Sequence, residues 1–148
     1  MIVDHNLTPM QNIINLINET NNTTFTVDDF VMLELAQTDF TGDIEVKNST
    51  VLATCTLNNE FYGNQELFYR RLYVQHILTA NTYSVQPGDT LESILLGIAA
   101  RYSMIPTELE WDLPNLNVLP GETKPYQLRA KSTSLVYVGE LEILISKI

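Results

Sequence analysis

The chain has 148 residues, 45% of them hydrophobic, which is enough to fill the core of one domain or of two very small ones. Its 18 acidic side chains outnumber the 8 basic ones and leave a net charge of −10, spread along the whole length. Such a surface repels phosphate backbones and anionic membranes, so we expect neither nucleic acid nor a membrane as a partner.

The first structural signal along the chain is a helix start at Thr8. Residues 1–6 before it lack a basic region and a long apolar run, so we expect no signal peptide and folding in a cytoplasm. Thr8 serves as the N-cap, Pro9 takes the first helical position, and Gln11 reaches back to complete a capping box. Apolar residues then recur at helical spacing and define the buried face: Met10, Ile13, Ile14 and Ile17.

A second capping signature, over residues 26–29, precedes the aromatic Phe30, and the same succession recurs in the second half of the chain. When the two halves are aligned without a gap, Thr8 matches Asp89 and Phe30 matches Trp111. The apolar helix faces match as well. This recurrence favours an internal pseudo-repeat; the alternative is a chance recurrence of common capping chemistry.

Most of the remaining segments favour strands. The β-branched and apolar residues over 45–57 and the alternating pattern over 66–77 each predict one strand. Segments 126–130 and 135–145 predict a C-terminal hairpin, which follows a proline-rich loop over 113–125.

We therefore predict the α+β fold class, as a single compact domain over residues 1–148 with two capped helices packed on antiparallel strands. Its halves, residues 1–78 and 79–148, would contribute to one shared sheet, because neither has enough apolar surface alone. Within this core Cys55 is expected to be a buried small hydrophobe and Trp111 an anchor.

The run from Tyr83 to Ile94 predicts a short strand, a Pro-Gly turn and a helix with Asp89 as N-cap and Glu92 as its capping-box partner. It also resembles the opening of a LysM domain, a small βααβ module with the signature Y-x-V-x-P-G-D-T-L-x-x-I. That resemblance implies a LysM-like second half and a peptidoglycan-binding site between two loops. The matching loop positions are Gly88, Asp89, Thr90 and Leu91, together with Pro120 and Gly121.

Side chains that perform catalysis or bind metal form no recognisable motif. His5, His76 and Cys55 have no metal-ligand spacing, so we expect no metal and no cofactor. No nucleophile elbow, phosphate loop or dinucleotide fingerprint occurs. The acidic clusters at 28–29 and 108–112 are expected to be structural, since carboxylates stabilise helix starts. The sequence therefore predicts a protein that is not an enzyme.

Five segments have a further pattern in common with a known group of proteins: residues 25–30, 48–51, 62–70, 81–93 and 138–141. In these segments the chain resembles small virion structural proteins of large contractile-tailed bacteriophages, over most of residues 10–145. The resemblance implies a non-enzymatic subunit of a tail or baseplate, made in the host cytoplasm and located in the virion. Its partners would be other virion structural proteins. The LysM-like run leaves a peptidoglycan-binding module as the alternative.

Overall fold

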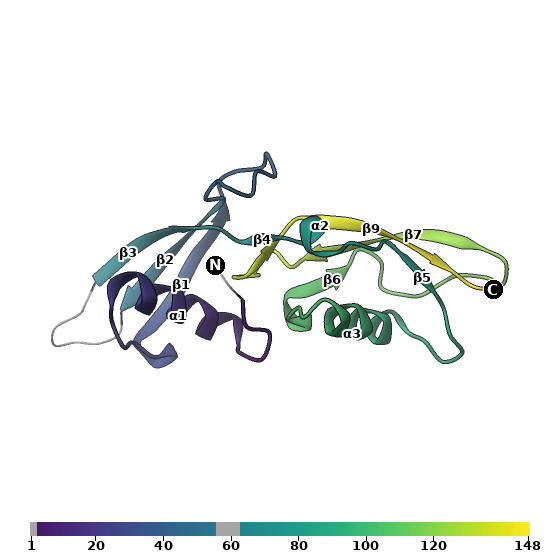
Figure 1. Cartoon of the computed structure of the whole chain (residues 1–148), viewed down its shortest axis with the longest axis horizontal. Helices are drawn as coiled ribbons and strands as arrows, with labels where there is room; N and C mark the ends of the chain where they lie inside the picture. The colour runs from purple at the N-terminus through teal and green to yellow at the C-terminus, as the bar shows by residue number, and fades with distance from the viewer. Residues whose placement is uncertain (1–2, 56–62) are drawn as a thin grey trace. The chain divides into compact units, whose positions relative to one another are not determined.

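The computed structural model describes residues 3–55 and 63–148, and the chain divides into two compact units, Met1–Leu72 (unit 1) and Tyr73–Ile148 (unit 2). Both units combine helices with antiparallel strands, so the predicted α+β class is confirmed (Figure 1). The predicted shared sheet is wrong: unit 1 has a three-stranded sheet and unit 2 a separate four-stranded one. Each sheet has its own covering helix, so each unit has its own small core.

Unit 1 begins with a helix and ends with an antiparallel sheet in the order β1-β2-β3. Its elements are α1 (Pro9–Asn21), the 3-10 turn η1 (Val27–Asp29), β1 (Phe30–Gln37), β2 (Ser49–Cys55) and β3 (Gly63–Tyr69). Helix α1 lies along one face of this sheet, and the core of the unit forms between them from Ile13, Ile14, Val51 and Ala53 (Figure 1).

Helix α1 begins where the sequence predicts. The Thr8 hydroxyl oxygen accepts a hydrogen bond from the Gln11 main-chain N–H at 3.1 Å, and Pro9 occupies the first turn. The predicted return bond from Gln11 is wrong, because its side-chain amide donates to Asn15 Oδ1 instead. The second capping signature is confirmed: Asp29 accepts from the Thr26 main-chain N–H at 2.7 Å.

Strand β1 was not expected from the sequence. Its residues include good helix formers, but pairing with β2 overrides this local preference. The register shifts between Leu33 and Ala36, where Glu34 adopts a left-handed φ of 53°. This irregularity is a β-bulge, which local sequence patterns do not announce.

A buried polar cluster fixes the chain segment that follows β3. Asn48 is fully buried; its amide nitrogen donates to the Arg71 carbonyl at 2.9 Å, and its Oδ1 accepts from the Arg71 main-chain N–H at 2.9 Å. The Arg71 Nε donates to the Ser49 hydroxyl at 2.5 Å. A buried amide satisfied in this way holds two chain segments together with specific geometry.

Unit 2 contains more elements and a more complex sheet, in the order β5-β9-β7-β6. Strand β4 (Leu72–Tyr73) starts at the last residue of unit 1 and leads into unit 2. The elements that follow are α2 (Val74–Ile77), β5 (Thr82–Ser84), α3 (Leu91–Arg101), the 3-10 turn η2 (Pro106–Glu108), β6 (Leu109–Trp111), β7 (Thr123–Ala130), β8 (Tyr137–Val138) and β9 (Glu140–Ser146). The predicted C-terminal pairing is confirmed, as β7 and β9 are antiparallel neighbours, but the second strand begins at Glu140 instead of residue 135, and β8 lies in the connection. Strand β5 runs parallel to β9.

Two predicted boundaries in unit 2 differ from the structure. Residues 74–77 form one helical turn instead of continuing a strand, because the Leu78 N–H bonds back to the Val74 carbonyl at 3.2 Å. Pro125 lies within β7 although a loop was predicted there. It is tolerated because β6 pairs only with residues 128–130, so no neighbour needs an N–H from Pro125 on that side.

The start of α3 also differs from the prediction by one residue. Gln86 to Asp89 form the expected turn, closed by the Asp89 N–H to the Gln86 carbonyl at 3.0 Å, with Gly88 at φ 90°. The N-cap, however, is Thr90, and its box partner is Ser93 instead of Glu92. The Asp89 carboxylate accepts from the Gln86 N–H at 2.7 Å, so it closes the turn and leaves capping to the next residue.

The two units share an order of elements: a capped helix, a 3-10 turn, and three strands paired as antiparallel neighbours. In unit 2 these strands are β6, β7 and β9, and β5 is an addition at the edge. The ungapped register is wrong, since the caps are Thr8 and Thr90, and the strands begin at Phe30 and Leu109. The recurrence of the elements favours the pseudo-repeat, which stays a prediction.

Candidate functional site

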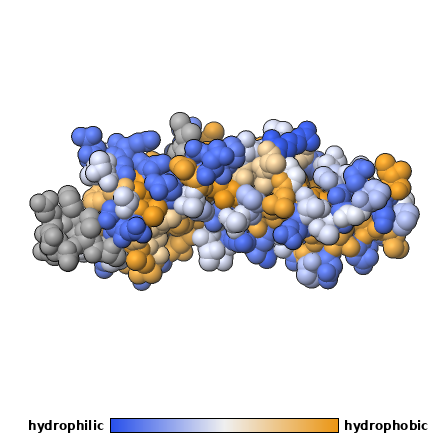
Figure 2. Space-filling model, turned by 90° about the horizontal axis from the view of Figure 1, so that it is seen from below, coloured by the Kyte–Doolittle hydropathy of each residue, from blue (hydrophilic) through white to orange (hydrophobic). Residues whose placement is uncertain are grey.

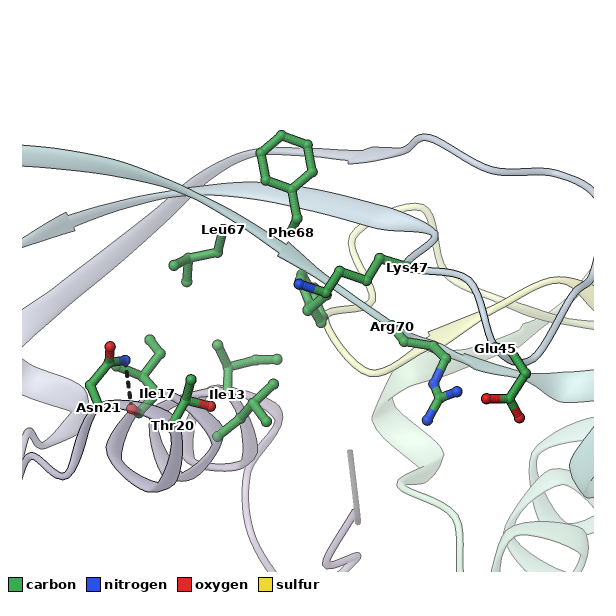
Figure 3. A pocket seen from close by; sticks show the side chains of 11 residues that line it. Ile13, Ile17, Thr20, Asn21, Glu45, Lys47, Leu67, Phe68 and Arg70 are labelled. Atoms are coloured by element: carbon green, nitrogen blue, oxygen red, sulfur yellow. Dashed lines mark hydrogen bonds between the residues drawn. The ribbon is translucent and has the colours of Figure 1, made fainter.

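A groove of about 410 Å³ lies in unit 1 between α1 and β3 (Figure 3). Helix α1 contributes an apolar side with Ile13, Leu16 and Ile17. The facing side consists of residues 67–70, at the end of β3 and just beyond it. Because β3 is the last of the described strands in the order β1-β2-β3, the groove opens along a free sheet edge.

The groove wall includes the main chain of β3, as the orientation of Phe68 indicates. Leu67 and Tyr69 point to the α1 side of the sheet, and Phe68 lies opposite Thr50 on the other side. A groove that is lined by side chains from both faces of β3 runs along the strand edge, where main-chain N–H and C=O groups face outward.

The groove is lined by two basic side chains and one acidic one, Glu45, in a unit that is otherwise acidic. Unit 1 has three basic residues, Lys47, Arg70 and Arg71. Arg71 is buried in the polar cluster, and the other two both line the groove. Arg70 Nη1 donates to the Ile44 carbonyl, which fixes the loop that carries Lys47. Lys47 is exposed, so its ammonium is accessible to an anionic group.

The sheet face of unit 1 that points away from α1 is also partly apolar. Val31, Leu33 and Phe68 have exposed fractions of 46%, 48% and 55%. The register places Leu33 beside the half-buried Leu52, which continues the apolar band toward β3. Figure 2, seen from below, views unit 1 from the side of α1, at the left of the view, where hydrophobic and hydrophilic residues are mixed.

The corresponding face of unit 2 is polar. Arg129 on β7 lies between Glu110 on β6 and Glu140 on β9, and its Nε is 2.9 Å from Glu110 Oε1. Further along the same face, Gln127 lies beside Glu142. These side chains are solvated, so they form no apolar surface that needs a cover.

The two loops predicted for glycan binding do approach the same end of unit 2. Strand β5 leads into the first loop, and the Val85 N–H bonds to the Ser146 carbonyl at 2.8 Å. In the second loop, the Gly121 N–H bonds to the Lys147 carbonyl at 2.7 Å. The end of β9 therefore lies between the loops. The strands next to these loops, β5 and β7, would be the two strands of the predicted βααβ module, but they do not pair, because β9 lies between them.

The polar groups of both loops are engaged in local structure. Leu91 is buried, and its carbonyl accepts from Trp111 Nε1 at 2.8 Å, which ties α3 to the sheet. Beside Pro120, the Glu122 carboxylate accepts from the Leu119 N–H at 2.9 Å. That hydrogen bond, helped by Lys124, holds the pKa of Glu122 below its ordinary value.

Tyr83 lies next to the first loop. Partial burial, together with the charge and hydrogen bonding of Asp89, raises the pKa of Tyr83 above 10.0, so the phenol stays protonated at neutral pH. Asp89 and Thr90 thus serve turn closure and helix capping, while Gly88 and Gly121 supply the positive φ of their turns.

The predicted acidic clusters have structural partners. Glu108 accepts from the Leu135 N–H at 2.8 Å, and Asp112 accepts from the Gln127 N–H at 2.9 Å. Glu110 pairs with Arg129 as described. Asp29 belongs to its capping box, while Asp28 lies exposed in the same turn.

The histidines and the cysteine lie apart. His5 is exposed, and His76 packs against Tyr73 with ring centroids 5.2 Å apart and the ring planes tilted by 54°. Cys55 is half-buried at the end of β2, so its predicted full burial is wrong. Over residues 3–55 and 63–148, no group of three or more His, Cys, Asp or Glu side chains could hold a metal ion. None of the helices in this part of the chain has the length and apolarity to span a bilayer.

A family model matches residues 2–148, nearly the whole chain, and its description is "Family of unknown function (DUF7941)". The chain belongs to this family. No curated protein and no solved structure matches the sequence.

Sequence reasoning missed the residues of the groove and of the exposed face of unit 1. One signal was available: the lysine and arginine residues among the first 72 residues all lie between positions 47 and 71. The alternation of Val31 and Leu33 with their neighbours was a weaker signal, since it is interrupted at Glu34. Of the segments that carry the resemblance to virion proteins, residues 62–70 begin outside the described residues.

Proposed function

We propose that the chain is a non-enzymatic structural adaptor of a bacteriophage particle, in the tail or baseplate, that works through protein–protein contacts. The sequence resemblance to virion structural proteins is the reason for placing it in a particle. The single observation that carries the contact role is the exposed apolar face of unit 1, with Val31, Leu33 and Phe68.

An exposed apolar band on one sheet face, with a polar counterpart in the other unit, favours a one-sided contact. Burying the exposed part of such a side chain contributes roughly 1 kcal/mol or more to association. The net charge of −10 keeps the free subunit soluble and opposes self-association, so basic partner surfaces are favoured.

The test is the protein composition of particles made by the genome that encodes this chain. Mass spectrometry of purified particles should detect the chain at a fixed ratio to the other structural proteins. A Leu33→Asp variant should be incorporated less than the parent, because a charge on the apolar face opposes burial. Gln127→Asp, on the polar face of unit 2, is the matched control. Absence of the parent chain from particles would overturn the proposal.

One observation favours the alternative of a peptidoglycan-binding module: the two Pro-Gly loops flank the same end of β9. A pull-down of the pure chain on purified peptidoglycan separates the two proposals. The adaptor role predicts no retention, whereas retention that survives high salt would favour the glycan role.

A further inference from the structure

The groove between α1 and β3 has three properties that together define an occupant. Its helix side is apolar apart from Thr20 and Asn21 near the end of α1, and its sheet side is the outer edge of β3. Its charged side chains are two basic ones, Lys47 and Arg70, and one acidic one, Glu45. The outer edge of a sheet accepts an extended chain, because the main-chain groups that point away from the neighbouring strand can form a further ladder of hydrogen bonds.

We propose that this groove binds an extended segment of a partner protein, with alternating apolar residues followed by a carboxylate. The segment adds a strand beside residues 67–70. Every second side chain enters the groove against Ile13, Leu16 and Ile17, and the carboxylate lies at Lys47 and Arg70.

The distribution of charge in unit 1 favours an anionic segment of a partner protein over a second copy of the chain or a free anion. In the groove, Lys47 and Arg70 outnumber the one acidic side chain, Glu45. All other exposed charged side chains in the described part of unit 1 are acidic, so an anionic segment is attracted there only at this groove. A second copy of the chain is disfavoured by its net charge of −10. The apolar side of the groove disfavours a free inorganic anion, which would gain nothing from Ile13 and Ile17.

The inference deepens the proposed function, on which it rests only in taking the segment to belong to a neighbouring subunit. Binding of a peptide by the isolated chain is measured without particles. If the peptide does not bind, the proposed role in a particle is still testable by particle composition. If the chain is absent from particles, peptide binding in the groove is still testable with the isolated chain.

The experiment uses a fluorescein-labelled octapeptide that alternates valine and threonine and ends in two aspartates. Fluorescence anisotropy with the full chain at low salt should show saturable binding. A peptide with asparagines in place of the aspartates should bind about tenfold more weakly, because the attraction to Lys47 and Arg70 is lost. A peptide with proline at its centre should not bind, because proline lacks the N–H that the β3 ladder needs.

Matched protein variants locate the site. Lys47→Glu should weaken binding of the aspartate peptide by about tenfold, since it replaces an attraction by a repulsion. Lys147→Glu makes the same charge change on an exposed side chain of unit 2 and should leave binding unchanged. Circular dichroism spectra that overlay the parent spectrum establish that both variants fold.

Two results would overturn the proposal. One is the absence of binding by the aspartate peptide at millimolar concentration. The other is binding that neither the central proline nor Lys47→Glu reduces, since such binding occurs elsewhere on the surface.

Discussion

Units 1 and 2 present opposite chemistry on the sheet faces that their helices leave uncovered. Unit 1 exposes Val31, Leu33 and Phe68, whereas unit 2 exposes a row with Arg129 between two glutamates. The two units share an order of helix, 3-10 turn and antiparallel strands. The fold therefore does not determine which face binds partners; the residues at alternate strand positions do.

The largest expected effect is a loss of stability that is confined to unit 1. Asn48→Ala should lower the free energy of unfolding of unit 1 by about 3 kcal/mol, because it removes buried hydrogen bonds to Arg71. Trp111 is the only tryptophan and lies in unit 2, so its fluorescence reports that unit, while circular dichroism reports both. In a urea titration, an early dichroism transition should appear and the fluorescence transition should stay in place.

The exposed Asn64 on β3 supplies the control, since Asn64→Ala removes no buried partner. If Asn48→Ala instead shifts the fluorescence transition as far as the dichroism transition, the units unfold as one and the comparison between them fails.

The next effect concerns unit 2 and two of its glycines. Gly139 has φ 86°, and a Cβ at this position would overlap the side-chain oxygen of Gln75. Gly139→Ala should therefore destabilise unit 2 by about 2 kcal/mol, measured by the fluorescence transition in urea. In α3, a methyl group added at Gly97 would meet nothing within 4 Å, so Gly97→Ala should stabilise the same transition by about 0.5–1 kcal/mol. Equal effects of the two substitutions would contradict the structure.

A smaller effect compares the helix caps. Thr8→Ala in unit 1 and Thr90→Ala in unit 2 should each cost about 1 kcal/mol, because each hydroxyl accepts a main-chain N–H of the first turn. Glu92→Ala should change stability by less than about 0.5 kcal/mol, since Ser93 completes the box. Urea titrations of the three variants measure these losses of stability. A larger loss for Glu92→Ala than for Thr90→Ala would restore the cap predicted from sequence.

The smallest expected effect appears at alkaline pH. Burial raises the pKa of Tyr137 above its ordinary value of 10.0. The folded state therefore holds this proton more tightly than the unfolded state. Its contribution to stability is complete below pH 10 and is lost as the pH rises through the folded pKa. The stability of unit 2 should fall over this range, and fall less steeply in Tyr137→Phe. An unchanged slope would exclude Tyr137 as the group responsible.

Local features were predictable from the sequence and long-range ones were not. The Thr8 cap and the Pro87-Gly88 turn follow from a few adjacent residues, and both are confirmed. The division into two sheets depends on which distant strands pair, and no local pattern contains that information. Strand β1 was not predicted because several of its residues favour a helix locally, whereas pairing with β2 stabilises the strand.

The candidate groove could not be predicted because it depends on where α1 lies against β3. The clustering of Lys47, Arg70 and Arg71 was visible, but burial separates their roles: Arg71 joins the polar cluster, and the other two line the groove. The predicted glycan positions were brought to one end of unit 2, yet their polar groups are committed to turns and caps.

The position of β9 has a consequence for folding kinetics. Strand β9 is the last of unit 2 in sequence, but it pairs on both sides, with β5 and with β7. The parallel pair with β5 closes a long loop that includes α3, which is slow compared with hairpin formation. The described strands of unit 1 pair with their sequence neighbours and need no comparable step. During synthesis, unit 1 can therefore acquire its native topology before β9, the strand that pairs with β5, has been made.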